Sequence, residues 1–213
     1  VMKREEKVKE IIKRLKKLYP DAKIALKFNT PLDLLVATIL AAQCTDERVN
    51  KVTESLFKKY KTPEDYAKAN RRKFEKEIKP TGFYRNKAKS IINACKKIIS
   101  DFGGKVPDTM EDLLKLPGVA RKTANIVLAN AYNVVVGIPV DTHVKRLSQR
   151  LGLTKEKDPV KIERDLLEIV PKKELKKFPY LLIDHGRAVC NAKKPLCEEC
   201  VLSDLCDYYK GKK

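Results

Sequence analysis

The stretch LPGVARKTAN, Leu116 to Asn125, places a tight turn directly before a helix and decides the fold of the chain. Pro117 and Gly118 mark the turn, and residues 120–131 have the composition of a helix. A short helical pattern precedes the turn and begins at Thr109, which is expected to cap it together with Asp112. Helix, short turn and helix together predict a helix-hairpin-helix, although Pro and Gly also occur in many plain helix-to-helix turns.

A hairpin of this kind exposes backbone N–H groups at its turn and at the start of its second helix. These groups form a phosphate-binding site that contacts a nucleic-acid backbone without reading bases. The predicted contacts come from five consecutive or nearly consecutive positions: Leu116, Gly118, Val119, Ala120 and Arg121.

Lys122 is expected in the first turn of the helix that follows the hairpin. The positive end of the helix dipole disfavours a charged ammonium there, so we expect a lowered pKa. A neutral amine can attack an electrophilic sugar carbon and form a Schiff base, which a protonated Lys cannot do. The simpler interpretation, solvated surface, applies to most Lys residues of so basic a chain.

The motif VDTHV, residues 140–144, follows one helix later. Asp141 is expected at a helix N-terminus, where its carboxylate stays ionised. It can stabilise a cationic sugar as a base departs, or orient the nucleophile and carry its proton. The ordinary alternative is an N-cap without a catalytic role. Thr142, beside it, is a predicted DNA contact.

The composition favours a polyanionic partner. Lys and Arg number 47 against 28 Asp and Glu, a formal charge of +19, which points first to nucleic acid. A thermophile surface is also rich in Lys and Glu, but mixed ion-pair networks do not require such an excess. No apolar run approaches the ~20 residues that span a bilayer, and the N-terminus lacks a secretory signal. We therefore expect an intracellular protein, cytoplasmic and nucleoid-associated if prokaryotic.

Helical spacing of apolar residues recurs along the chain, whereas alternation typical of strands persists nowhere. The predicted fold class is all-α with about ten helices, and the apolar helix after Asp33 is expected at the centre of the core. A continuous helix is expected from about Lys173 to Arg187. Helix starts are predicted at Thr30-Pro31, Thr45-Asp46, Thr62-Pro63, Asp141 and Asp158-Pro159.

Four cysteines near the C-terminus have the spacing C-x6-C-x2-C-x5-C: Cys190, Cys197, Cys200 and Cys206. In a reducing compartment this pattern predicts a metal site, either tetrahedral zinc or a 4Fe–4S cluster. Zinc ribbons normally have two close cysteine pairs, and only one is present, so the spacing favours iron and sulfur. Cys44 and Cys95 stand on separate apolar helices and are interpreted as core residues.

With these motifs, LIDHGR at residues 182–187 and ATILAAQCTD at residues 37–46, the chain resembles the endonuclease III family of DNA glycosylases. The resemblance implies that Lys122 is the nucleophile, that Asp141 assists it and that the four cysteines bind a 4Fe–4S cluster. It also implies two helical lobes around a DNA cleft. Residues 22–135 would form a six-helix lobe carrying the hairpin, and residues 1–21 plus 136–213 a discontinuous lobe carrying the cluster.

The resemblance further implies side chains that enter the duplex where the damaged nucleotide is flipped out. Gln43 and the loop of Thr81, Gly82 and Phe83 occupy the matching positions, although Phe83 can also be interpreted as a buried aromatic residue at a helix start. Lys193 and Lys194 resemble the phosphate contacts of the family. One position departs from the family pattern: Ala120 stands where a second Gly is usual.

The function that follows is a bifunctional glycosylase and AP lyase. It would excise oxidised pyrimidines from duplex DNA and cleave the strand at abasic sites by β-elimination through a Lys122 Schiff base, acting as a monomer. A monofunctional G·T or G·U mismatch glycosylase is one alternative, but such relatives tend to have Tyr or Ser at the position of Lys122. The other is a non-catalytic DNA-binding iron–sulfur module, which leaves Lys122 and Asp141 unexplained.

Overall fold

A computed structural model describes residues 2–212, and in this range it contains twelve α-helices, four short 3-10 helices and no strand. The all-α prediction is confirmed. The helix number exceeds the expected ten because very short helices such as Met110–Leu113 and Asp207–Lys210 carry weak sequence patterns. No helix among the described residues combines the length and the apolar character needed to cross a bilayer.

The chain divides into two compact units by its internal contacts. Unit 1 comprises Val1–Lys23 and Gly137–Lys213, and unit 2 comprises Ile24–Val136. Val1 and Lys213, the outer ends of the lobe predicted at 1–21 plus 136–213, lie outside the described residues.

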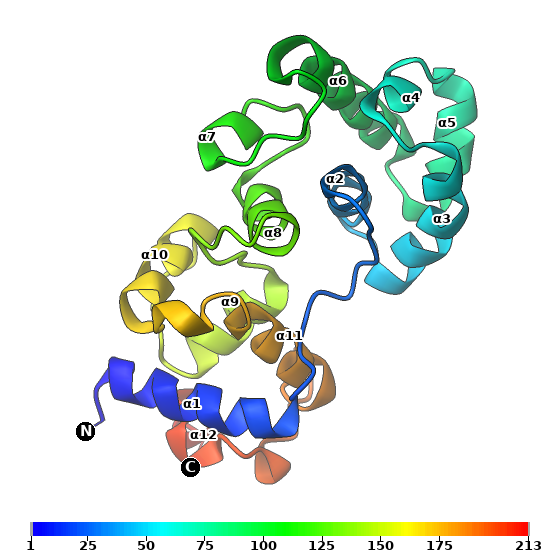
Figure 1. The fold of residues 1–213 in the computed structure, drawn as a ribbon. Coiled ribbons are helices and arrows are strands. Elements are labelled where there is room, and N and C mark those ends of the chain that lie inside the picture. Colours follow the sequence, from blue (N-terminus) through cyan, green and yellow to red (C-terminus); the bar gives the residue numbers. More distant parts are fainter. Residues whose placement is uncertain (1, 213) are drawn as a thin grey trace. The chain divides into compact units, whose positions relative to one another are not determined.

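Unit 2 surrounds one apolar helix, α2 (Pro31–Leu40), whose residues 32–40 are all buried. Thr30 caps it, since its hydroxyl accepts from the Asp33 amide at 3.1 Å. Figure 1 shows the other helices of the unit around α2, and contacts join it to α3, α6 and α8. These helices are α3 (Asp46–Lys59), α4 (Pro63–Ala67), α5 (Arg71–Ile78), α6 (Tyr84–Phe102), α7 (Met110–Leu113) and α8 (Arg121–Ala131), with a 3-10 turn η1 (Lys79–Thr81).

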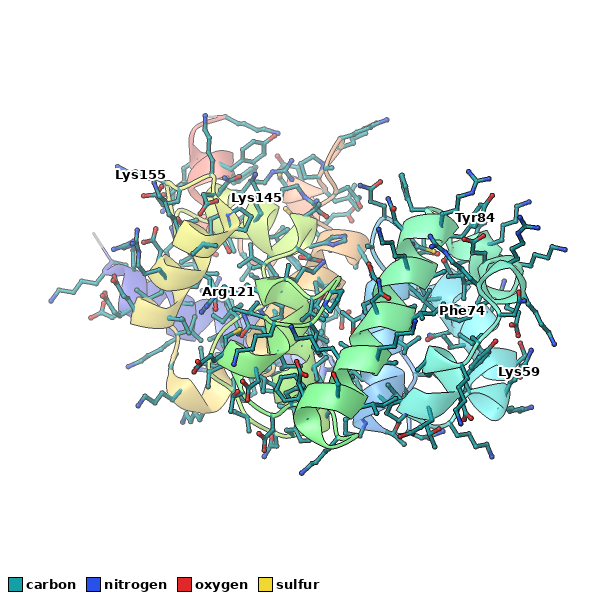
Figure 2. The ribbon with its side chains drawn as sticks, turned by 90° about the horizontal axis from the view of Figure 1, so that it is seen from above. Lys59, Phe74, Tyr84, Arg121, Lys145 and Lys155 are labelled. Carbon is teal, nitrogen blue, oxygen red and sulfur yellow. The ribbon has the colours of Figure 1, made fainter. Side chains whose placement is uncertain are left out.

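Aromatic packing closes one side of this core. The Tyr60 and Tyr66 rings stack with centroids 4.8 Å apart, and the Phe74 ring lies 5.3 Å from Tyr60. Figure 2 shows Phe74 among the helices and Lys59 at the outer edge of the unit. Tyr66 and Phe74 have no exposed surface, so each contributes a large buried apolar area.

Unit 1 packs α1 (Arg4–Leu18) against α10 (Pro159–Ile169) and α11 (Phe178–Ala188), and α9 (Thr142–Arg150) against α11. Ile11 and Leu15 of α1 are fully buried. The segment that follows α11 contains η3 (Cys197–Glu199), η4 (Ser203–Leu205) and α12 (Asp207–Lys210). Figure 1 places this segment beside α1, so the two ends of the chain share one unit.

The predicted continuous helix from Lys173 to Arg187 is wrong. A 3-10 turn, η2, covers Lys172–Glu174, and α11 begins only at Phe178. Pro179 gives the reason, because a proline inside a helix lacks the N–H donor and its ring clashes with the carbonyl of the preceding turn. The helix therefore starts where Pro179 falls into its first turn.

Candidate active site and cysteine centre

The predicted hairpin lies between α7 and α8, and we call residues 114–120 the hairpin turn. The Leu116 amide donates to Leu113 O at 3.1 Å, and the Val119 amide donates to Leu116 O at 3.2 Å. Leu116 and Val119 are buried, whereas Gly118 and Ala120 are exposed. The two apolar side chains thus anchor the hairpin turn, and the outward positions are Gly118 and Ala120.

Gly118 satisfies two constraints at once. Its φ is +77°, a value that L side chains rarely adopt, and a Cβ built on it would lie 2.7 Å from Ser90 Cβ in α6. The hairpin turn therefore approaches α6 more closely than any side chain at position 118 permits.

We expect Gly118→Ala to destabilise the protein by about 3 kcal/mol, the sum of left-handed strain and the collision with Ser90. Gly103→Ala is the matched control, since Gly103 also has a positive φ but its added Cβ meets nothing within 4 Å. Urea unfolding of Gly103→Ala should show a free energy of unfolding that is only about 1 kcal/mol lower than that of the native protein, from the strain alone. Adding Ser90→Gly should restore part of the loss in Gly118→Ala. Equal losses in the two alanine variants would contradict the close approach.

Ala120, the departure from the family pattern, is the N-cap of α8 with φ −96° and ψ 177°. This extended backbone suits any residue, so the hairpin turn needs no second glycine at this position. Ala120 has no side-chain acceptor to cap the helix. The first amides of an α-helix have no partner within the helix, so those of the start of α8 are available in principle to an anion.

Lys122 is the second residue of α8, as predicted, and its side chain is exposed. Within residues 2–212, no hydrogen bond or ion pair engages its amine. Arg121, the first residue of the helix, is partly exposed and is labelled in Figure 2. The Lys122 amine, close to the N-terminus of α8, is thus free of a carboxylate partner within the described chain.

Asp141 is the N-cap of α9 in unit 1. Its Oδ1 accepts from the Val144 amide at 2.8 Å, and its Oδ2 lies 3.1 Å from His143 Nδ1. Two contacts fix the carboxylate, which is partly exposed, at the positive end of α9. His143, within the VDTHV motif, is a partner that the sequence analysis did not select. Thr142 is the exposed first residue of α9.

Gly186 of the LIDHGR motif explains how α11 approaches this end of α9. A Cβ at Gly186 would lie 3.0 Å from both His143 Cδ2 and Arg146 Nη2. The absence of a side chain therefore allows α11 to pack directly on the residues around the Asp141 cap.

The side chains predicted to enter the duplex lie on two turns of unit 2. Gln43 follows α2 and Phe83 precedes α6, and both have left-handed backbones, with φ of 53° and 43°. Phe83 is 63% exposed, so the alternative of a buried aromatic residue at a helix start is wrong. Thr81 differs, because it is buried and its hydroxyl donates to Ile78 O at 2.8 Å. The Thr81 side chain is therefore part of the turn's interior and does not reach a surface that DNA can contact.

The four cysteines of residues 190–206 carry free thiols and line one cavity, together with apolar side chains that include Leu147 and Leu202. Among residues 2–212, no group of three or more His, Cys, Asp or Glu side chains converges closely enough for a single metal ion. The thiols instead surround a shared space. Burial raises the pKa of Cys200 and of Cys206, so the thiolates need a bound cation.

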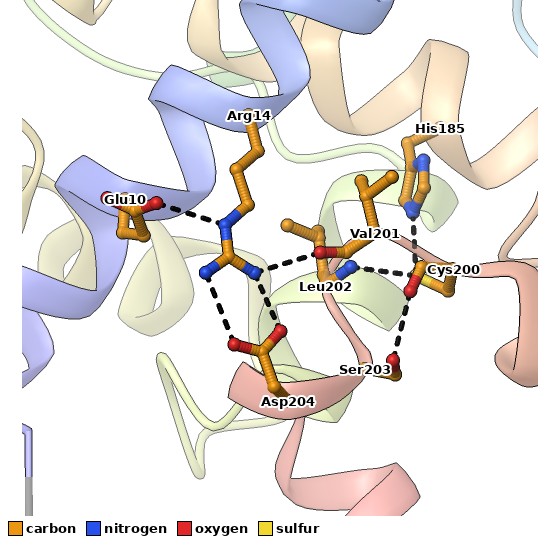
Figure 3. A network of polar contacts seen from close by, with 8 residues as sticks. All are labelled: Glu10, Arg14, His185, Cys200, Val201, Leu202, Ser203 and Asp204. Carbon is orange, nitrogen blue, oxygen red and sulfur yellow. Dashed lines mark hydrogen bonds and ion pairs between the residues drawn. The ribbon is translucent and has the colours of Figure 1, made fainter.

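Hydrogen bonds reach the sulfurs from several directions. His185 Nε2 lies 3.2 Å and the Leu202 amide 3.4 Å from Cys200 Sγ (Figure 3), and Arg150 Nη1 lies 3.3 Å from Cys190 Sγ. Burial lowers the pKa of His185 to about 4, so the ring is neutral near pH 7. The Tyr19 hydroxyl lies 2.9 Å from Nδ1, and when it donates there, Nε2–H is left to donate to Cys200. Donors aimed at cysteine sulfurs fit an iron–sulfur cluster, whose thiolates accept such bonds.

Arginines bind near both ends of residues 190–206, which we call the cysteine segment. Arg146 of α9 donates to Cys190 O at 2.9 Å, and Arg150, one turn later, donates to Asn191 O at 2.9 Å. Figure 3 shows Arg14 of α1, which binds Asp204 at 2.6 Å and Val201 O at 2.9 Å. This guanidinium holds the pKa of the Asp204 carboxyl below its usual range.

These arginines were missed by the sequence analysis. Arg146 and Arg150 share one face of α9, which is a visible signal, but their acceptors are main-chain carbonyls that no motif identifies. Lys193 and Lys194 follow directly on the segment that α9 holds, and both are exposed as predicted surface contacts require.

Comparison with known proteins gives two family matches. The model of the HhH-GPD superfamily of base excision DNA repair proteins matches residues 36–172, and the model of the iron–sulfur binding domain of endonuclease III matches residues 190–206. The endonuclease III of Synechocystis is 57% identical over 203 residues, which are 95% of this chain and 93% of that protein.

Solved structures give the same result. A trapped endonuclease III–DNA covalent intermediate, an estranged-adenine complex, superposes with a TM-score of 0.94 at 40% identity and covers 100% of this chain and 99% of its own. A thermostable thymine-DNA glycosylase has a TM-score of 0.85 at 28% identity, with 96% and 97% of the two chains covered.

Proposed function

This chain belongs to the endonuclease III family, within the HhH-GPD superfamily of base excision DNA repair proteins, and we propose that Lys122 and Asp141 are its catalytic residues. It is a DNA-binding N-glycosylase and AP lyase with a 4Fe–4S cluster. The observation that supports the assignment of Lys122 is its position in the first turn of α8, directly after the hairpin turn.

The proposed reaction begins when the Lys122 amine attacks C1′ of the damaged nucleotide. The new N–C1′ bond forms as the N-glycosidic bond breaks, and the base leaves with its electron pair and takes up a proton. The nitrogen then loses a proton, and its lone pair forms the C=N bond of a Schiff base as the C1′–O4′ bond breaks. The electron pair of that bond goes to O4′, which takes up a proton. Loss of a C2′ proton expels the 3′ phosphate by β-elimination, and water finally releases Lys122.

We assign charge stabilisation and proton transfer to Asp141. Its Oδ1 is held by the Val144 amide and its Oδ2 by His143, so the carboxylate cannot rotate freely. A fixed carboxylate stabilises positive charge that develops on a sugar as the base departs, without reorganisation at that moment. His143 is on this account a positioning residue, because it acts on Asp141 and not on the nucleotide.

The DNA contacts form two proposed sets. The amides of Gly118, of Ala120 and of the first turn of α8 bind phosphates and position the protein, together with Arg121, Thr142, Lys193 and Lys194. Gln43 and Phe83 enter the duplex and occupy the space of the flipped nucleotide. The contact division at residues 24–136 supports our proposal that residues 22–135 fold as one lobe and the remaining segments as another.

Cys190, Cys197, Cys200 and Cys206 are the proposed cluster ligands. A cluster bound by four thiolates ties together a segment of unit 1 that otherwise has only short 3-10 helices. We propose a structural role for the cluster: when bound, it would stabilise the fold of the loop that carries Lys193 and Lys194. Monomeric state and intracellular location stay predictions.

Affinity for duplex DNA should fall steeply with salt, because phosphate contacts release counterions. We expect Lys193→Ala and Lys194→Ala each to weaken binding to all sequences and to reduce the slope of log K against log salt by about 1. Lys13→Ala, an exposed lysine of α1, should leave the slope unchanged in the same anisotropy titration. An unchanged slope in the double variant Lys193→Ala/Lys194→Ala would show that neither residue contacts phosphate.

The substrate test uses four duplexes that carry thymine glycol, uracil, a G·T mismatch or an abasic site. We expect base release and strand cleavage together on thymine glycol, and cleavage alone on the abasic site. Base release from the mismatch without cleavage would instead favour the chemistry of the thymine-DNA glycosylase that shares this fold. Failure on all four duplexes by cluster-loaded protein would contradict the proposed function.

A further inference from the structure

The two turns that carry Gln43 and Phe83 share an unusual backbone. Among residues 2–212, non-glycine residues with positive φ are limited to these two and Asn133. A residue of this size in the left-handed region persists only where its surroundings fix it. Gln43, Phe83 and Gly118 of the hairpin turn line the same open cavity. Whatever fixes the two turns therefore also determines how their side chains are presented around that cavity.

One buried side chain joins the two turns. Lys87 of α6 is 5% exposed, and its Nζ donates to Leu40 O and to Thr81 O, each at 2.8 Å. Leu40 is the last residue of α2, three positions before Gln43, and Thr81 is the last residue of η1, two positions before Phe83. A single ammonium thus holds one carbonyl group shortly before each of the two exposed side chains.

This arrangement has an energetic cost, because a buried ammonium loses its hydration. Lysine is almost never fully buried unless it is paired, and burial lowers the pKa of Lys87. The two acceptors of its hydrogen bonds are main-chain carbonyls, which are neutral. The carbonyl at the end of α2 lies at the negative end of the helix dipole and favours a cation, which partly offsets the loss of hydration.

We propose that Lys87 is a positioning residue that sets the spacing of the two turns, so that Gln43 and Phe83 enter the duplex together. This inference rests on the proposed function, because it assumes that both side chains contact the duplex. Lys87 itself does not touch the reacting atoms. Its effect should therefore appear only in steps that need the duplex to be opened.

The test compares two substrates. Single-turnover excision of thymine glycol from duplex DNA requires insertion, whereas cleavage at an abasic site in single-stranded DNA requires none. We expect Lys87→Met to lower the first rate at least tenfold and to change the second less than threefold. The matched control is Lys89→Met, an exposed lysine two residues later in α6, which should change neither rate. Equal losses on both substrates would assign Lys87 a general structural role and overturn the proposal.

A double-mutant cycle separates this inference from the proposed function. If Lys87 acts through the two turns, Lys87→Met should cause less than a threefold further loss in the background of Gln43→Ala/Phe83→Ala. Multiplicative losses would overturn the inference. If Gln43→Ala/Phe83→Ala excises from duplex DNA at the native rate, the assignment of these residues to the duplex fails instead, and the positioning role fails with it.

Foldedness is checked by circular dichroism and by iron content. Should Lys87→Met not fold, Lys87→Gln takes its place in both tests. Its amide keeps two N–H donors, which favours folding, but its shorter chain changes where they lie relative to the two carbonyls, so we expect the same results. If neither variant folds, Lys87 belongs to the core and not to the presentation of the turns, which also contradicts the proposal.

Discussion

Lys122→Gln should lose strand cleavage at an abasic site by roughly 10³-fold or more, the scale of loss when a covalent nucleophile is removed. A glutamine amide nitrogen cannot form a Schiff base, because its lone pair is delocalised into the carbonyl. Binding to the same duplex should change less than threefold, since the phosphate contacts of the hairpin turn come from backbone amides. Single-turnover cleavage and anisotropy binding measure the two quantities.

Lys89→Gln is the control for the loss of one positive charge, and it should cleave at the native rate. Cleavage by Lys122→Gln at that same rate would remove Lys122 from the chemistry. Loss of binding in parallel with cleavage would instead mean that the amine contributes mainly to docking. The two outcomes are distinct because Lys122 is exposed and no partner within residues 2–212 holds it.

Cys200→Ser should lose the cluster and destabilise unit 1 by at least about 4 kcal/mol, or roughly 8–16 °C in Tm for a chain of this size. Cys200 Sγ accepts from the Leu202 amide at 3.4 Å and lies 3.2 Å from His185 Nε2, so two neighbouring groups orient this sulfur. A serine hydroxyl is a poor ligand for iron, so the variant should not hold the cluster. Without the cluster, the loop has little other regular structure. Iron content and thermal unfolding measure the effect.

Cys44→Ser is the matched control, because Cys44 is a half-buried thiol of unit 2 outside the cysteine segment. It should retain full iron and unfold within a few degrees of the native protein. A Cys200→Ser protein that keeps its iron and its Tm would show that residues 190–206 fold without the Cys200 thiolate. The structural role assigned to the cluster would then be wrong.

Local rules accounted for most helix ends. Thr30 and Asp141 were predicted as N-caps from residue type alone, and in the structure each accepts the amide three residues later. The same reasoning failed between Lys173 and Arg187, where apolar spacing suggested one helix. Pro179 sets that boundary because proline lacks a backbone N–H donor, and the spacing of apolar residues does not reveal this.

The site was predictable where its residues are close in sequence. The four cysteines lie within seventeen positions, and Lys122 follows its hairpin directly. By contrast, Lys87 binds carbonyls that are 47 and 6 positions away, and Arg14 pairs with Asp204 across 190 positions. Main-chain carbonyls carry no sequence signature, so such partners appear only when the chain is folded. Burial of Thr81 was missed for the same reason.

Borohydride reduction during reaction with a thymine glycol duplex, followed by digestion and mass spectrometry of the protein–DNA adduct, identifies the nucleophile. A Schiff base is reduced to a stable secondary amine, so the modified residue can be identified. We predict one adduct, on Lys122, that is absent in Lys122→Gln and abundant in Lys89→Gln. An adduct on any other residue, or an undiminished adduct in Lys122→Gln, would contradict the account.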